Sequence, residues 1–112
     1  MAAIKELPHD LLAEKSLLGC LLIDGLSFDD ISDLKIKGED FFHPQYGVIF
    51  DSIADLAGDN MPVDYVTLCS KLTEKGKIEE VGGQTAVLEL NEEVASAANI
   101  YHYGKTVKDK SS

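Results

Sequence analysis

Residues 44–57, with the sequence PQYGVIFDSIADLA, decide the fold class of this protein. Their apolar residues recur at steps of three and four, the period of one face of an α-helix. Pro44 stands at a plausible first-turn position, where its missing N–H is not needed. We therefore predict a helix at the centre of the core, with an apolar side made of Tyr46, Ile49, Phe50, Ile53, Leu56 and Ala57.

Two helical patterns precede this segment. Pro8 and Asp10 supply a start signal for a helix that runs to about Ile23. Ser27, three residues before Asp30, resembles a capping arrangement and predicts a short second helix.

Three helical patterns follow. Asp64 is the predicted cap of a helix that ends at Gly76, and a further helix is expected near residues 85–91. Ser96 is the predicted cap of the last helix. No segment alternates with a period of two for long enough to predict a sheet.

The predicted class is therefore all-α, as a compact orthogonal bundle of about six helices joined by short turns. A chain of 112 residues suits one domain. We expect its core to include Leu18, Leu22, Ile49, Phe50, Ile53, Leu68 and Leu72.

Composition points to a protein of the cytoplasm. The longest apolar stretch, Leu17 to Ile23, is much too short to span a membrane, and no basic region leads into a cleavable apolar segment at the N-terminus. Cys20 and Cys69 each fall on the apolar side of a predicted helix, where a thiol behaves as a small hydrophobe. No disulfide is implied.

Charge argues against nucleic acid as a direct partner. The formal net charge is −10, and the chain contains no arginine. Affinity for DNA depends chiefly on lysine and arginine neutralising phosphates, so direct DNA binding is not expected. An acidic surface favours basic protein surfaces instead.

The sequence contains few residues in a pattern that could form a catalytic or metal site. His9, His43 and His102 lie far apart, without cysteines or carboxylates at metal-ligand spacing. The pair Gly82-Gly83 precedes a predicted helix, but the flanking strand and the Lys-Ser/Thr of a P-loop are missing, so a turn that needs permissive glycines is favoured. We predict no catalytic, cofactor-binding or metal residues in this chain.

Acidic clusters are interpreted first as solvated helix surface, and second as a docking face for a basic partner. They do not have the spacing of a calcium-binding loop. The clusters are Asp29-Asp30-Asp33, Glu79-Glu80 and Glu92-Glu93.

The last predicted helix carries an apolar stripe, and the sequence does not decide what this stripe packs against. The stripe consists of Ile100, Tyr103 and Val107, with Gly104 permitting close approach. It could complete the core. Because five earlier helices could already close a bundle, and because this helix has no stop signal, we favour a projecting helix that pairs with another element or subunit.

Four short blocks of sequence carry a family resemblance. They are Pro8-His9-Asp10, Ala13-Glu14, Ser16-Leu17-Leu18-Gly19 and Asp24; Asp40-Phe41-Phe42, Pro44 and Ile49-Phe50; Pro62-Val63-Asp64, Val66-Thr67-Leu68, Leu72, Gly76, Val81-Gly82-Gly83 and Leu88; and Ser96-Ala97-Ala98-Asn99-Ile100 with Tyr103. Their order and spacing resemble the N-terminal domain of DnaB-type bacterial replicative DNA helicases. Two departures are Tyr46, where the family usually has histidine, and Gly104-Lys105-Thr106, which replaces a more apolar stretch.

The resemblance implies a domain organisation. Residues 1–7 would be a flexible N-terminus, residues 8–95 the globular head of a collar domain, and residues 96–112 the start of the first helix of a truncated helical hairpin. The subunit interface would then involve Ile100, Tyr103, Gly104 and Val107.

The resemblance also implies a function without catalysis in this chain. Such collar domains associate in pairs above a hexameric ATPase ring and receive the helicase-binding domain of primase. The full-length protein would be an ATP-dependent 5′–3′ DNA helicase, with ATP and magnesium bound in a motor domain that is not part of this chain. A free-standing acidic helical adaptor is the alternative, and a small helical enzyme is a third hypothesis.

Overall fold

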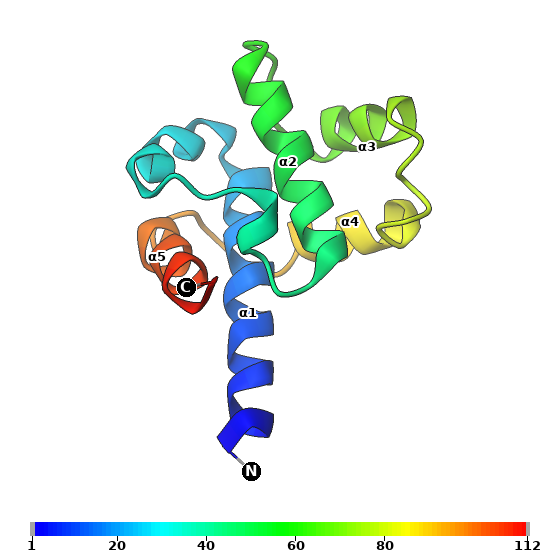
Figure 1. Ribbon diagram of the computed structural model, residues 1–112. Coiled ribbons are helices and arrows are strands. Elements are labelled where there is room, and N and C mark those ends of the chain that lie inside the picture. The colour runs from blue at the N-terminus through cyan, green and yellow to red at the C-terminus, as the bar shows by residue number, and fades with distance from the viewer. Residues whose placement is uncertain (1, 112) are drawn as a thin grey trace.

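The computed structural model describes the backbone of residues 2–111 and the side chains of residues 11–110. Over these residues the chain forms five α-helices and two 3-10 helices without a strand, which confirms the predicted all-α class (Figure 1). The elements are α1 (Ala2–Ile23), η1 (Gly25–Leu34), η2 (Gly38–Asp40), α2 (Pro44–Gly58), α3 (Tyr65–Glu74), α4 (Gly83–Asn91) and α5 (Ile100–Ser111).

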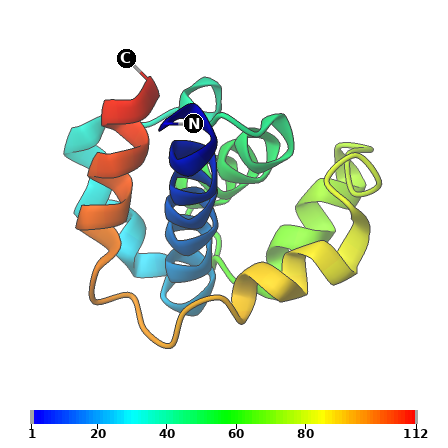
Figure 2. The same cartoon turned by 90° about the horizontal axis from the view of Figure 1, so that it is seen from below.

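The helices form an orthogonal bundle, as predicted. Figure 1 shows α1 and α2 in the middle, with η1 and α5 on one side and α3 and α4 on the other. Viewed from below, α5 runs back alongside α1 (Figure 2), and these two helices pack against each other. In the described part of the chain, no helix combines the length and the apolar character needed to cross a membrane.

Helix α2 contributes the centre of the core. Its side chains Ile49 and Ile53 are fully buried, and Phe50 is 2% exposed. The ring of Phe50 lies 5.8 Å from that of Phe28 and 5.2 Å from that of Phe41, so α2 joins η1 and the segment after η2 into one apolar cluster. The structure also buries the four expected core residues outside α2, which are Leu18, Leu22, Leu68 and Leu72.

Helix α2 and η2 touch through two glycines. A Cβ atom on Gly47 would lie 2.4 Å from the carbonyl oxygen of Gly38, and a Cβ atom on Gly38 would collide with the carboxylate of Asp51. That carboxylate accepts a 2.9 Å hydrogen bond from the Gly38 N–H. Only residues without side chains permit this approach, because a methyl group on either would overlap its neighbour.

Helix α1 begins earlier than predicted. It starts at Ala2, so the expected start at Pro8 and Asp10 was wrong and Pro8 is an interior residue. Proline inside a helix removes one hydrogen bond but does not forbid helical backbone on both sides. Met1 and the side chains of residues 2–10 lie outside the described part of the chain. They include the side chain of His9 and the side chains of residues 1–7, the segment expected to be flexible.

The second element is a 3-10 helix, and its cap differs from the predicted one. Asp24 is the N-cap and accepts from the Leu26 N–H, whereas the buried Ser27 hydroxyl donates to the Asp24 carbonyl. Residues three apart lie on one face of a 3-10 helix, which is how Phe28, Ile31 and Leu34 all meet the core.

Two other local predictions fit the structure. Asp64 is the N-cap of α3, where its carboxylate accepts from the Thr67 N–H at 2.9 Å. Gly82 and Gly83 have φ values of 104° and 81°, and the N–H of Gly83 donates to the Ile78 carbonyl at 2.8 Å. The glycine pair is therefore a turn that only glycine adopts readily.

Candidate functional site

The apolar stripe of α5 is part of this chain's own core. Ile100 is 3% exposed and Val107 is 2% exposed, while Tyr103 is half-buried against the same cluster. A Cβ atom on Gly104 would lie 3.1 Å from Leu34 and 3.2 Å from Ile31 of η1. In this chain η1 and α1 cover Ile100 and Val107, so the stripe completes the domain's own core, and a part for these residues in a subunit interface stays a prediction.

The solvent side of α5 is polar. Tyr101 is 45% exposed, and its hydroxyl donates to Asp33 of η1 at 3.4 Å. Lys105 pairs with Asp109 at 3.8 Å on the outside of the helix. Any partner that meets α5 from outside would therefore contact mainly hydrogen-bonding groups. A stripe alone does not show what covers it, so the sequence could not distinguish packing within the domain from a subunit contact.

Glu14 is a buried carboxylate that sequence reasoning did not single out. Only 3% of it is exposed, and it accepts hydrogen bonds from the backbone N–H of Phe42 at 2.6 Å and of His43 at 3.3 Å. Its Oε1 also lies 3.0 Å from Nδ1 of His43. The carboxylate thus serves the start of α2, where the His43 side chain makes no cap of its own.

The surroundings of Glu14 are built for structure and not for catalysis. The ring of His43 meets that of Phe42 edge-on and that of Tyr46 at a tilt, with ring centroids 5.2 Å and 5.4 Å apart. Burial raises the pKa of Tyr46, and the negative charge of Glu14 raises it further. The hydrogen bonds that Glu14 accepts come from Phe42 and His43, the two residues that precede α2, so this carboxylate has an obvious structural role.

Large apolar side chains on the surface indicate a binding site for another molecule better than Glu14 does. Leu26 is 84% exposed, Val66 70%, Phe42 62% and Met61 50%. Single exposed apolar residues are normal on any protein, but a group beside a hollow marks a site for another molecule. Of these, Leu26 and Met61 line the same hollow.

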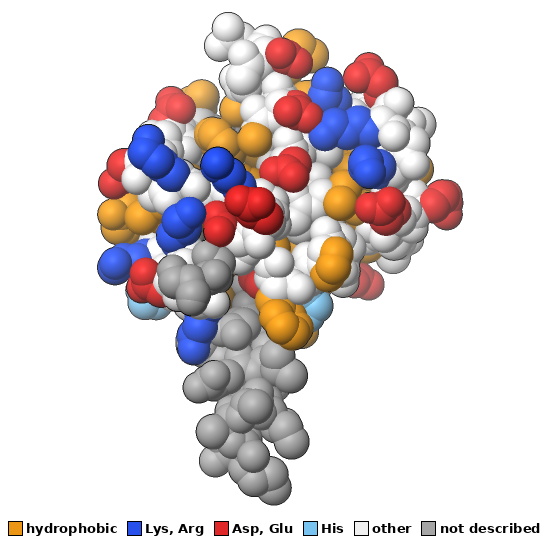
Figure 3. Space-filling model, in the orientation of Figure 1, with side chains coloured by type: hydrophobic (Ala, Val, Ile, Leu, Met, Phe, Trp, Pro, Cys, Tyr) orange, Lys and Arg blue, Asp and Glu red, His pale blue; other side chains and the backbone are white. Residues whose placement is uncertain are grey.

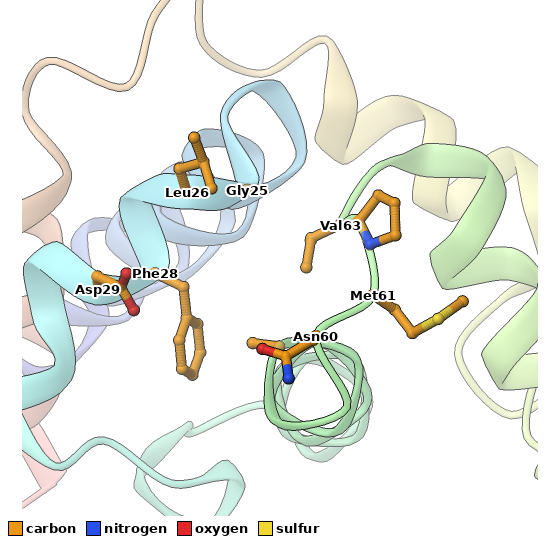
Figure 4. A pocket seen from close by; sticks show the side chains of 9 residues that line it. Gly25, Leu26, Phe28, Asp29, Asn60, Met61 and Val63 are labelled. Carbon is orange, nitrogen blue, oxygen red and sulfur yellow. The ribbon is translucent and has the colours of Figure 1, made fainter.

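This hollow opens between η1 and the turn that joins α2 to α3. It measures about 520 Å³. Figure 4 shows Phe28 and Val63 directed into it from opposite sides, with Leu26 at the η1 rim and Asn60 at the end of α2. No sequence motif could have revealed this hollow, because η2 and most of α2 separate its two walls in the sequence.

Both acidic and basic side chains lie on the surface. On the face seen in Figure 3, lysines gather in one group near α5 and another near α2 and α3, with acidic side chains between them. In the latter group, Lys75 pairs with Asp55 at 2.5 Å and Lys71 with Asp59 at 3.9 Å. Among the residues whose side chains are described, no three histidines, cysteines or carboxylates are placed to hold a metal ion.

The remaining titratable candidates are ordinary. Cys20 and Cys69 are buried free thiols, and burial raises the pKa of both. His102 lies exposed on α5, with its ring 6.0 Å from that of Tyr103. The residues described thus present surfaces and a hollow, with no nucleophile activated by a neighbouring base.

Comparison with known proteins establishes the family. Residues 6–109 match the family described as "DnaB-like helicase N terminal domain". The N-terminal domain of DnaB helicase from Mycobacterium tuberculosis has the same fold, with a TM-score of 0.85 and 32% identity over 90% of this chain and 71% of that one. This chain belongs to the DnaB-like helicase N-terminal domain family.

Two curated relatives give the scale of the match. The replicative DNA helicase DnaB of Buchnera aphidicola subsp. Baizongia pistaciae (strain Bp) is 40% identical over 106 residues, which are 95% of this chain and 23% of that protein. The replicative DNA helicase DnaB of Leifsonia xyli subsp. xyli (strain CTCB07) is 34% identical over 103 residues, which are 92% of this chain and 22% of that protein. The chain spans less than a quarter of each relative.

Proposed function

We propose that this domain is the non-catalytic collar of a replicative DNA helicase, which pairs subunits within a ring and receives primase. The observation that carries the proposal is the family match over residues 6–109, combined with exposed apolar residues on a bundle of net charge −10. Such surfaces suit contacts with proteins and oppose contacts with phosphate backbones. ATP hydrolysis, with its magnesium ion, belongs in this proposal to a motor domain outside the chain.

The pairing surface in this proposal excludes the α5 stripe. Ile100 and Val107 are enclosed by their own domain, so subunits would meet through exposed groups such as Leu12, Phe42 or the outside of α5. A free-standing adaptor is the competing function. Reading the gene downstream decides between them, because a helicase requires a Walker A sequence in the same frame.

Deletion tests the proposal in the full-length protein. Removing residues 1–112 should abolish or weaken ring assembly, measured as mass by analytical ultracentrifugation, and should remove the stimulation of the helicase by primase. ATP hydrolysis by the remaining part serves as the control that the motor is folded. Unchanged assembly and unchanged primase response in the deletion variant would refute the collar role.

A further inference from the structure

We propose that the hollow between η1 and the α2–α3 turn is a docking site for a short helix of another protein, with apolar side chains on one face and lysines or arginines beside them. The proposal goes beyond the collar function and requires neither subunit pairing nor primase. Four features of the site carry it: exposed apolar groups, a second hollow that shares Met61, one-signed charge and a closed end.

The first feature is apolar surface that the domain itself leaves uncovered. Leu26 is 84% exposed although η1 has a buried face for its other apolar residues. Met61 is 50% exposed and lines the other wall. Methionine adapts its shape to different partners, and an apolar helix face placed here would remove both side chains from water.

The second feature is the length of the apolar surface. Met61 also lines a smaller hollow of about 280 Å³, which it shares with Leu56, Thr67 and Ser70. Figure 4 shows the Met61 side chain directed away from Phe28 and toward α3. Met61 therefore borders both hollows, which together offer a longer surface than either alone, and such a surface suits a helix better than a compact small molecule.

The third feature is charge of one sign around the larger hollow. The residues that line it lie within 25–29 and 57–63, and Asp29 is the one charged residue among them. Together with the flanking residues 24, 30 and 64, these two segments contain five aspartates and neither lysine, arginine nor histidine. All five are exposed, and they are Asp24, Asp29, Asp30, Asp59 and Asp64. Complementary charge steers an approaching partner and excludes acidic ones, so the occupant should be basic beside its apolar face.

A second copy of this chain fits the site less well than a basic helix. In a two-fold contact each patch meets itself, so the five aspartates of one copy would face those of the other. Like charges placed together across an interface disfavour that pairing. Lys71 lies 3.9 Å from Asp59 and lines the smaller hollow, where it is the one basic residue on either lining.

The fourth feature is that one end of the hollow is closed and fixed. A Cβ atom on Gly25 would lie 2.7 Å from Cβ of Val63, so the start of η1 touches the turn before α3 directly. Asp24 and Asp64 each cap the helix that follows them, which holds both rims in place. A preformed site of this kind loses little conformational freedom when it binds.

The test uses a synthetic helix as the probe. The 112-residue chain, labelled with ¹⁵N, is titrated with an amphipathic peptide of about 14 residues that has leucines at i, i+3, i+4 and i+7 and lysines flanking them. Amide shifts should concentrate on residues 25–29 and 60–63. The same peptide with glutamates in place of its lysines should bind at least about tenfold more weakly.

Two variants in the hollow and one control variant separate docking from general attraction. Leu26→Ser should weaken binding of the lysine peptide at least about tenfold, and Met61→Ser should act in the same direction. Leu88→Ser removes a side chain that is 42% exposed on α4 and lines neither hollow, so it should leave the affinity unchanged. Circular dichroism before titration shows whether each variant is folded.

Three outcomes would overturn the proposal. Shifts spread evenly over the acidic surface, or equal weakening by Leu26→Ser and Leu88→Ser, would show attraction by net charge alone. Absence of shifts at millimolar probe would show that the hollow does not accept a helix. A dimer that dissociates in the Leu26→Ser variant, seen by analytical ultracentrifugation, would identify a second copy as the occupant.

Discussion

The carboxylate of Glu14, on α1, lies 3.0 Å from Nδ1 of His43, the residue that precedes α2. The same carboxylate accepts two backbone N–H groups from the segment that opens α2. A side chain from one helix therefore completes the start of another. This contact fixes the direction in which α2, the central helix of the core, leaves the preceding loop.

Glu14→Gln should lower the free energy of unfolding by roughly 1–3 kcal/mol, because an amide nitrogen would replace one buried acceptor oxygen. Glu79→Gln makes the same charge change on an exposed residue and should shift stability by less than about 0.5 kcal/mol. Urea titration measures both. Equal effects of the two substitutions would mean that net charge matters and the buried contact does not.

Gly47→Ala should destabilise the domain by roughly 1–3 kcal/mol, since its Cβ would overlap the backbone of η2. Gly58→Ala is the matched control in the same helix. A Cβ atom there meets nothing within 4 Å, so this change should stabilise by up to about 1 kcal/mol. Thermal melts that fall in the opposite order would contradict the close approach of η2 and α2.

Phe50→Ala should cost about 3–5 kcal/mol of stability, because it would leave a cavity between the rings of Phe28 and Phe41. Phe42→Ala removes the same ring from a residue that is 62% exposed, and should cost less than about 1 kcal/mol. A denaturant titration in which Phe50→Ala costs no more than Phe42→Ala would show that the ring of Phe50 is not in the core.

Replacing Ile100 and Val107 together by aspartate should unfold the chain, since each buried unpaired charge costs several kcal/mol. Replacing His102 and Lys105 by aspartate alters the exposed side of the same helix and should leave the fold intact. Circular dichroism and the melting temperature report the outcome. A folded Ile100/Val107 variant with altered assembly would restore the interpretation of the stripe as a subunit contact.

The chain by itself should not bind single-stranded DNA at physiological salt, because its net charge of −10 repels phosphates and no arginine is available. Fluorescence anisotropy with a labelled oligonucleotide is the measurement. Micromolar binding that weakens steeply as salt rises would contradict this expectation.

The spacing of apolar residues predicted the helices well, because this signal depends only on residues close together in the sequence. The spacing around Ile49, Phe50 and Ile53 defines α2 without knowledge of its partners, and the structure buries all three. The same signal left the partner of Ile100 and Val107 open, because an apolar stripe shows that one helix face is buried and does not show which element buries it. Here α1 and η1 bury this face, and neither lies near α5 in the sequence.

The sequence contained a signal from which the buried carboxylate of Glu14 could have been predicted. Glu14 stands three, four and seven residues before Leu17, Leu18 and Leu21, so it shares their helix face. A carboxylate among buried leucines requires hydrogen-bond donors, which predicts a contact with backbone N–H groups. The hollow beside Leu26 had no such signal, since segments distant in sequence form its walls.

The packing of α5 against η1 and α1 has a consequence for synthesis on the ribosome. Gly104 sits against Ile31 and Leu34, which precede it by some seventy positions in the chain. Until α5 has left the exit tunnel, the inner side of η1 is exposed to water and to other apolar chains. Premature release or a pause late in translation would therefore expose this surface, making the nascent domain a substrate for chaperones and prone to aggregate.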